Sequence, residues 1–279
     1  MTARTLLLTA LAMLAFAGNS LLCRAALRDS QIDPASFTAL RLFAGALVLW
    51  LLLYTRKRAA TVPGNWAGAF SLFIYAAAFS YAYLHLDAGA GALLLFGAVQ
   101  LSMITCGLLR GERLHRLQVV GLVLAAAGLV ALLLPGTSTP SLSASCLMVL
   151  AGIAWGAYSL LGKGTPDPLA ATAGNFIRTL PIVTVLCLVA LGSLEWDSAG
   201  VVYALLSGGL TSGIGYAIWY AAMPGLAAIQ AASVQLSVPL LTALAGSVLL
   251  GESLTGRLML AGVAILGGIA LVLRYKHRT

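Results

Sequence analysis

The sequence predicts an all-α polytopic membrane protein in which ten transmembrane helices form two inverted five-helix repeats. Hydrophobic residues make up 61% of the chain and charged residues 9%, and the mean hydropathy is +0.99. A soluble domain of this composition would expose far too much apolar surface to water. The apolar residues also fall into runs of about the length that crosses a bilayer, and the second half of the chain repeats a motif of the first.

Each predicted span is an apolar run that ends at Pro, Gly or charged residues. A helix needs about 20 apolar residues to cross the hydrocarbon core of a bilayer. The predicted spans cover residues 5–27, 35–54, 65–86, 88–109, 117–134, 142–162, 168–191, 199–221, 225–250 and 256–274. The breaks at residues 29–34, 56–64, 87, 111–116, 135–140, 164–168, 195–197, 224–225 and 251–255 carry the residues that interrupt helices.

A short motif occurs once in each half of the chain. Gly111-Glu112 is followed by Leu114, and Gly251-Glu252 is followed by Leu254 in the same pattern. Each copy closes one apolar run and precedes the next, which indicates an internal repeat. The sequence therefore predicts repeats at residues 1–136 and 137–279. Because five spans are an odd number, the second repeat is inverted in the membrane, and a substrate site is expected between the two.

The basic residues predict that both termini are cytoplasmic, since cytoplasmic loops carry an excess of Lys and Arg. With the N-terminus inside, 11 of the 16 basic residues fall on the cytoplasmic side and three outside, while two lie within spans. The inner set is Arg4, Arg56, Lys57, Arg58, Arg110, Arg113, Arg116, Lys163, Arg274, Lys276 and Arg278, the outer set is Arg24, Arg28 and Arg257, and the two within spans are Arg41 and Arg178. Loop charge explains the net charge of +8 better than nucleic-acid binding does.

A cleaved signal peptide is the alternative for the first span. Arg4, the apolar residues that follow it and Ala15-Phe16-Ala17 match the signal-peptide pattern. The apolar run continues to Leu27, which is longer than the hydrophobic region of a signal peptide. We therefore expect an uncleaved first span.

Motifs for catalysis or metal binding are absent from the sequence. The four cysteines, Cys23, Cys106, Cys146 and Cys187, show no ligand-like spacing. The three histidines form no HExxH motif, and no GxSxG motif occurs. The sequence predicts neither an enzyme nor a protein with a metal or another cofactor.

Several further residues complete a family resemblance that extends over the whole chain. Each half has an Arg in its second helix, Arg41 and Arg178, in addition to the repeated Gly-Glu-x-Leu motif. Gly18 and Trp155-Gly156 lie in the first helix of each half, and Gln235-Leu-Ser-Val-Pro239 lies in the ninth span. With ten spans in two halves, this ordered set resembles the EamA-type members of the drug/metabolite transporter superfamily.

The resemblance implies a secondary transporter in the bacterial inner membrane that moves small metabolites by alternating access. In general likeness, the sequence is most similar to bacterial amino-acid exporters, including exporters of aromatic amino acids. No residue of the sequence is specific for the recognition of an amino acid, so the substrate is a hypothesis.

The polar residues predicted at membrane depth are neutral amides. All eight Asp and Glu residues lie in loops or at helix ends, which disfavours proton exchange through an embedded acid. The amides are Asn19, Gln100, Asn175, Gln230 and Gln235. Amides both donate and accept hydrogen bonds, as a zwitterionic substrate requires. The alternative is that they only connect neighbouring helices. Pro239 is expected to kink the ninth span, which favours Gln235 over Gln230.

Aromatic residues at helical spacing provide a second group of candidates. Tyr75 and Phe79, Trp155 and Tyr158, and Tyr216 and Trp219 share helix faces and line a path or pack in the core. The predicted substrate-binding residues are Asn19, Tyr75, Gln100, Trp155, Tyr158, Asn175, Arg178, Tyr216, Trp219 and Gln235.

Four further charged or titratable residues are interpreted from their positions in the predicted spans. Arg178 lies near the predicted midplane and either attracts a substrate carboxylate or has a structural role. Arg41 lies nearer a helix end, where its side chain would extend to the headgroups. Arg24 is interpreted as an anchor at the outer end. His85 is either a proton-sensing residue or a solvated histidine at a helix end.

The leading hypothesis is an exporter of small zwitterionic metabolites, amino acids including aromatic ones, that acts as a monomer in the bilayer. The alternative is a multidrug transporter that expels hydrophobic cations. A membrane-embedded enzyme or scaffold is the third possibility, although no motif supports it.

Overall fold

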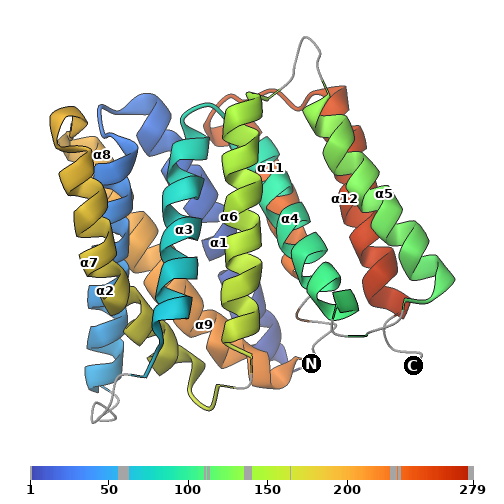
Figure 1. Cartoon of the computed structure of the whole chain (residues 1–279), viewed down its shortest axis with the longest axis horizontal. Helices are drawn as coiled ribbons and strands as arrows, with labels where there is room; N and C mark the ends of the chain where they lie inside the picture. Colours follow the sequence, from blue (N-terminus) through green and yellow to red (C-terminus); the bar gives the residue numbers. More distant parts are fainter. Residues whose placement is uncertain are drawn as a thin grey trace.

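The computed structural model is a bundle of helices, and it describes residues 2–55, 63–109, 111, 114–134, 140–163, 165–226, 231 and 234–275 (Figure 1). No strand occurs among these residues. The helices of the first half are α1 (Ala3–Asp29), α2 (Pro34–Thr55), α3 (Trp66–Tyr83), α4 (Ala88–Leu109) and α5 (Arg116–Leu133). Those of the second half are α6 (Leu142–Leu161), α7 (Pro168–Val189), α8 (Ser198–Leu205), α9 (Gly215–Ala222), α11 (Ser237–Leu249) and α12 (Gly256–Tyr275).

The ten predicted spans all correspond to helical segments of the described chain. Eight segments are long and apolar enough to cross a membrane, and one of them, Ser198–Gly225, comprises α8, α9 and the helical residues between and after them. The other two segments are α3, with 18 residues, and the shorter α11. The prediction of an all-α membrane protein is therefore confirmed.

The eighth span contains a feature that the sequence does not reveal. Between α8 and α9 the chain forms a π-helical segment, η2 (Leu206–Ile214), which includes three glycines. A side chain at Gly208 would collide with the backbone carbonyl of Arg41, so glycine lets η2 lie directly against α2. π-helical turns often occur at functional sites because they redirect side chains.

The ninth span is interrupted where the sequence predicts a kink. Residues 227–230, 232 and 233, among them Gln230, lie outside the described part of the chain. A turn at Leu236 separates the short helical piece at Val234 and Gln235 from α11. Pro239 falls in the first turn of α11, where its missing amide hydrogen breaks no helical hydrogen bond.

The packing of the helices repeats when the two halves are exchanged. In the first half α3 and α4 pack on α6, and in the second half α9 and α11 pack on α1. The pairs α2 with α7, α4 with α11 and α5 with α12 each join equivalent helices, as a two-fold axis requires; Figure 1 shows α5 and α12 side by side. The halves are inverted repeats. Their proposed boundary at 136 and 137 lies outside the described residues.

Three aspartates at helix ends start the helices that follow them. The Asp33 carboxylate accepts hydrogen bonds from the amides of Ala35 and Ser36, at 2.8 and 3.0 Å. Asp167 caps α7 and Asp197 caps α8 in the same way. Such caps satisfy amides that a helix leaves free at its start. The position of these acids therefore has a structural cause.

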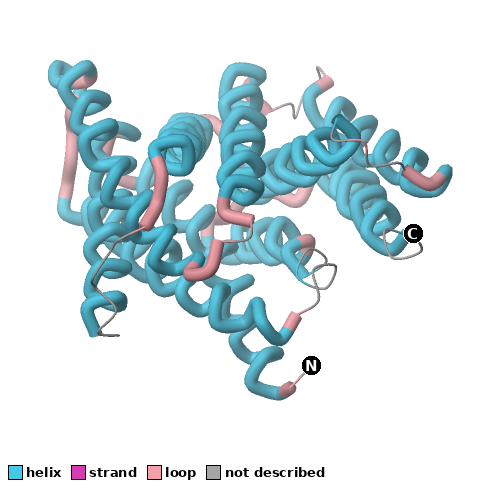
Figure 2. The backbone as a smooth tube through the Cα atoms, turned by 60° about the horizontal axis from the view of Figure 1, so that its bottom comes forward, coloured by secondary structure: helices cyan, strands magenta, loops and turns pink. Residues whose placement is uncertain are grey.

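The two ends of the bundle are called upper and lower, as they stand in Figure 1. The upper end contains the connections from α1 to α2, from α3 to α4 and from α11 to α12. The lower end contains those from α2 to α3, from α4 to α5 and from α6 to α7. Figure 2 turns the lower end toward the viewer, where α1 begins and α12 ends.

Candidate functional site

A cavity of about 1130 Å³ lies between the two halves of the chain. Its wall takes residues from α1, α3 and α4 of the first half and from α6, α7, η2 and α9 of the second. At the lower end the wall reaches Leu108, Leu114 and Lys163, beside the loops that follow α4 and α6. Among the described residues, none from the connections of the upper end lines it. The cavity is therefore open toward the lower end.

Trp155 of α6 is the centre of an aromatic cluster in the cavity wall. Its ring stacks on Tyr158 and Tyr216, with centroid distances of 5.3 and 5.4 Å. The ring of Tyr75, from α3, tilts against Trp155 at 4.8 Å. On the opposite side Phe16 of α1 contacts Tyr216 at 5.9 Å and Trp219 at 6.0 Å. Rings from both halves thus form one surface that can enclose an apolar or aromatic group.

Asn19 of α1 is held in one orientation by its neighbours. Its Oδ1 accepts hydrogen bonds from Ser207 Oγ at 2.7 Å and Thr211 Oγ1 at 3.3 Å, both in η2. This leaves Nδ2 directed at the Tyr75 hydroxyl, 3.4 Å away. Asn19 therefore connects the two halves and also lines the cavity.

Other polar groups of the wall differ in whether they already have partners. Tyr158 Oη donates to Thr172 Oγ1 at 3.1 Å, and Thr172 is 3.0 Å from the Tyr220 hydroxyl. Gln100 of α4 is 7% exposed and lines the cavity, and no described residue forms a hydrogen bond with its side chain. Gln235, just before α11, is half-buried in the same wall.

Asn175 and Arg178 of α7, both predicted to bind substrate, have different surroundings. Asn175 lines the cavity, and its Oδ1 accepts a hydrogen bond from the Asn65 amide at 2.9 Å. Arg178 is not in the cavity wall; its Nη1 donates to the Gly174 carbonyl one turn earlier, at 3.0 Å. Gly64, with a φ of +132°, brings the start of α3 against this part of α7. Arg178 therefore lies outside the cavity wall, because its side chain lies against its own helix and the α2–α3 loop, and these contacts agree with the structural alternative for this residue.

Nine of the ten predicted binding residues thus line one cavity, and Arg178 is the exception. His85, the predicted proton-sensing residue, is exposed at the upper end, outside the cavity wall. Among the described lining residues none is Asp or Glu, and Lys163 carries the one formal charge. No three His, Cys, Asp or Glu residues converge as metal ligands anywhere in the described ranges.

The upper end is closed by contacts around Arg24 of α1. Arg24 pairs with Glu252 in the α11–α12 loop and with Asp87 in the α3–α4 loop, each at 3.3 Å. Its Nη1 also donates to the carbonyls of Tyr83 and Leu84, at 2.9 and 3.1 Å. Arg24 is 9% exposed, so interpreting it as a surface anchor is wrong. We call Arg24, Asp87 and Glu252 the upper cluster.

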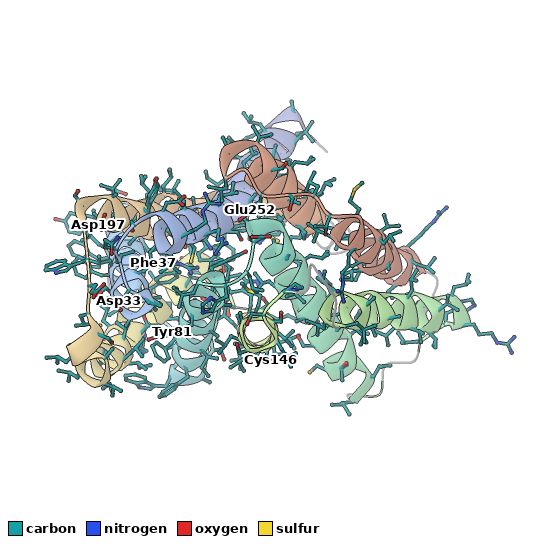
Figure 3. All side chains as sticks on the ribbon, turned by 90° about the horizontal axis from the view of Figure 1, so that it is seen from above. Asp33, Phe37, Tyr81, Cys146, Asp197 and Glu252 are labelled. Atoms are coloured by element: carbon teal, nitrogen blue, oxygen red, sulfur yellow. The ribbon has the colours of Figure 1, made fainter. Side chains whose placement is uncertain are left out.

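Glu252 connects the two halves at this end. From above it lies between α1 and α4 (Figure 3). Its Oε2 accepts a hydrogen bond from the Ala88 amide at 2.8 Å, and Arg28 donates to the neighbouring Leu250 carbonyl at 2.8 Å. Burial, and next the Asp87 carboxylate, raise the pKa of Glu252 despite the opposing effects of Ala88 and Arg24. Its repeat equivalent, Glu112, lies outside the described residues.

Arg41 is a buried residue whose position the sequence did not predict. Only 2% of it is exposed, and its Nη2 donates to the Tyr75 hydroxyl at 3.0 Å. The prediction that it extends to the headgroups is wrong, because the guanidinium turns into the bundle toward Tyr75 and Phe79. An arginine about six residues from a helix end can extend either to the headgroups or into the bundle. The distance along the sequence therefore did not predict the direction of the Arg41 side chain.

Comparison with known proteins identifies the family. The EamA-like transporter family matches residues 3–134 and 142–274. An uncharacterized protein of Pseudomonas aeruginosa is 64% identical over 97% of this chain and 94% of its own. An uncharacterized transporter of Archaeoglobus fulgidus is 25% identical over the full length of both chains. The uncharacterized transporter YoaV of Bacillus subtilis is 23% identical over 86% of this chain and 87% of its own.

A solved crystal structure has the same fold. It superposes with a TM-score of 0.70 and 19% identity, over 100% of this chain and 99% of the other. The two matched segments correspond to the two inverted repeats and cover nearly the whole chain. The protein is a polytopic membrane transporter that belongs to the EamA-like family of the drug/metabolite transporter superfamily.

Proposed function

We propose that the protein exports small zwitterionic metabolites, amino acids including aromatic ones, by alternating access through the cavity between its repeats. The observation that carries this proposal is the chemistry of the cavity wall. Rings around Trp155 offer a surface for an aromatic or apolar side chain, and Gln100 offers an amide without a partner among the described residues. A binding site for small molecules typically combines such apolar walls with a few polar groups.

Charge favours a zwitterion over a hydrophobic cation. A transporter that binds organic cations needs negative charge at the site, commonly an embedded acid. The described wall of this cavity has no carboxylate, and the buried guanidinium of Arg41 lies behind it, bonded to the lining residue Tyr75. An isolated cation would meet the positive charge of Arg41 without a described carboxylate to offset it. A zwitterion offers a carboxylate as well, and its ammonium can lie against the ring faces.

Alternating access requires that one end opens while the other closes. The lower end is open and the upper cluster closes the other end, so the structure corresponds to one of the two expected states. The excess of Lys and Arg at the lower end favours placing it in the cytoplasm of a bacterial cell, with both termini there. An export cycle would then begin by binding a cytoplasmic metabolite.

The proposal also includes three further statements. The chain acts without a cofactor, it catalyses no reaction, and it works as a monomer because one copy surrounds the cavity with its own helices. Size-exclusion chromatography with light scattering in detergent would test the monomer, for which one chain of 28.7 kDa is expected.

Uptake into liposomes tests the function directly. Purified protein is reconstituted into liposomes loaded with unlabelled amino acid, and uptake of labelled tryptophan, threonine and lysine is followed with and without a pH gradient. We expect exchange of the neutral amino acids, with tryptophan inhibiting the uptake of threonine. Absence of uptake of any amino acid, together with proton-driven movement of a cationic dye, would overturn the proposal in favour of drug efflux.

A further inference from the structure

Arg41 carries a buried positive charge that no described acid neutralises. The ion pairs found among the described residues join Arg24 and Arg28 to Asp29, Asp87 and Glu252. Arg41 is absent from them, and its Nη1 is buried without any hydrogen-bond partner in the described chain. The guanidinium lies over the rings of Tyr75 and Phe79, 5.2 and 4.9 Å from their centroids. Such contacts offset only part of the cost of burying a cation.

The Tyr75 hydroxyl lies between this charge and the cavity. It receives hydrogen bonds from Arg41 Nη2 at 3.0 Å and from Asn19 Nδ2 at 3.4 Å. Guanidinium and amide nitrogens donate only, so both lone pairs of the hydroxyl are used. Its own hydrogen therefore remains available, and Tyr75 is part of the cavity wall. The arrangement provides a donor, polarised by a cation behind it, for an acceptor in the cavity.

The surroundings fix this arrangement. Tyr75 is 5% exposed and its ring is held between Phe79 and Trp155, at centroid distances of 5.4 and 4.8 Å. Asn19 is oriented from the other half of the chain by Ser207. In the same wall the Ser212 hydroxyl, from η2, is buried without a hydrogen-bond partner among the described residues. Arg41 Nη1 and Ser212 Oγ are thus two buried polar groups that have no partner among the described residues. Their position beside one cavity indicates that a ligand is expected there.

We propose that Arg41, Tyr75 and Asn19 form a carboxylate subsite at the closed end of the cavity. Tyr75 Oη donates a hydrogen bond to a carboxylate oxygen, Asn19 holds Tyr75 in place, and Arg41 supplies the compensating charge. This inference rests on the proposed transport of amino acids and identifies the group of the substrate that the protein recognises. It also explains why a cation is kept at depth in a transporter whose cavity wall lacks acids.

The test compares ligands that differ only in the carboxylate. Binding of tryptophan and of tryptophan amide to the purified protein in detergent is measured by calorimetry. The wild type is expected to bind tryptophan at least about tenfold more tightly, since charge-assisted hydrogen bonds are about twice as strong as neutral ones. Tyr75→Phe keeps the ring contacts but removes the donor, so it should abolish most of this preference. Tyr81→Phe is the matched control, because Tyr81 lies on the same helix α3 but outside the cavity wall, and it should leave the ratio unchanged.

A second variant tests the charge itself. Arg41→Gln should remove the preference for tryptophan over the amide, provided that its thermal unfolding shows a folded protein. If Arg41→Gln does not fold, the result for Tyr75→Phe alone decides whether the carboxylate subsite exists. An unchanged ratio in Tyr75→Phe, or equal binding of acid and amide by the wild type, would overturn the subsite.

A third ligand separates failure of the subsite from failure of the proposed function. If the wild type binds no amino acid, the proposed function fails, and indole-3-acetate, a carboxylate without an ammonium, is then titrated. Binding of indole-3-acetate that Tyr75→Phe weakens would support the carboxylate subsite independently. Absence of binding, or binding that Tyr75→Phe does not change, would overturn the subsite as well.

Discussion

The upper and lower ends of the bundle are built from equivalent helices but differ in what closes them. At the upper end Arg24 joins Asp87 and Glu252, so loops from both halves meet on one side chain. At the lower end the cavity wall continues to Leu108 and Lys163. The helix packing is nearly symmetric between the halves. The difference indicates that, in the proposed mechanism, a few polar contacts at the helix ends hold the closed end together.

The free energy of these contacts is similar to the free-energy difference expected between two conformations. Removing one partner of a buried ion pair costs about 3–5 kcal/mol, because the remaining charge stays buried. Two conformations of a transporter typically differ by a few kcal/mol. Contacts of this strength can bias the equilibrium between the two states of the proposed mechanism.

The largest effect is expected for Arg24→Ala, which removes the centre of the upper cluster. Glu252 and Asp87 would then repel each other without a cation, so closure should lose about 3–5 kcal/mol. The measurement is labelling of Ser20→Cys, a buried position of the cavity wall, with an impermeant reagent in a background free of other cysteines. We expect labelling from the upper side in Arg24→Ala and none in its parent.

Arg28→Ala is the matched control for this prediction. Arg28 is one turn further along α1 and pairs with Asp29, but both side chains are about one third exposed or more. An exposed pair contributes about 0–1 kcal/mol, so Ser20→Cys should stay protected. Equal protection in both arginine variants would show that the upper cluster does not close this end.

A smaller effect is expected for Trp155→Ala in the open cavity. The change removes ring contacts to Tyr75, Tyr158 and Tyr216. An aromatic pair contributes about 0.5–1.5 kcal/mol beyond its buried area, and substrate would lose a comparable contact. Affinity for labelled tryptophan should fall about tenfold, as measured by equilibrium binding. Trp50→Ala is the control, since Trp50 is 45% exposed on the outside of α2; a similar loss in both variants would contradict a role of the cavity.

The smallest effect is the pH dependence of closure. The pKa of Glu252 is raised in the closed state by burial and by Asp87, while Arg24 acts in the opposite direction. A raised pKa means that the closed state holds the proton more tightly than a solvated open state does. This contribution to closure is present below the ordinary carboxyl pKa and is lost as the pH rises through the raised value.

Labelling of Ser20→Cys from the upper side tests this sign, after correction for thiolate formation with a free thiol. The corrected rate should rise as the pH increases through the transition, because deprotonation of Glu252 removes this contribution to closure. Glu252→Gln removes the titrating group and should flatten the profile. A rate that rises on acidification in the parent protein would contradict the assignment.

The spans and most of the cavity residues could be predicted because they depend on local pattern. Apolar length locates helices such as α4, and helical spacing groups Trp155 with Tyr158. A neutral amide at membrane depth needs a hydrogen-bond partner, which only a polar cavity or a neighbouring helix provides. This is why Gln100 could be predicted as a cavity residue. These signals need no knowledge of which helices touch.

The residues that the sequence placed wrongly depend on contacts between distant segments. Arg24 meets Glu252 only because the second half folds back onto α1, and residue spacing contains no record of that pairing. Arg41 and Arg178 each lie in the second helix of their half, yet Arg41 reaches Tyr75 while Arg178 bonds its own helix. The direction of a long side chain is decided by the partner it finds.

Two native cysteines allow the most direct test of a cavity that is open at the lower end alone. Cys106 lines the cavity near the end of α4, and Cys146 is exposed near the start of α6, at the upper end (Figure 3). Variants that keep one of them, with the other three cysteines replaced by serine, are reconstituted into liposomes. An impermeant maleimide is then added on either side of the bilayer. We expect Cys106 and Cys146 to react with the maleimide from opposite sides of the bilayer, and saturating tryptophan should slow only the reaction of Cys106. Reaction of Cys106 from both sides, or from the same side as Cys146, would contradict the proposed mechanism.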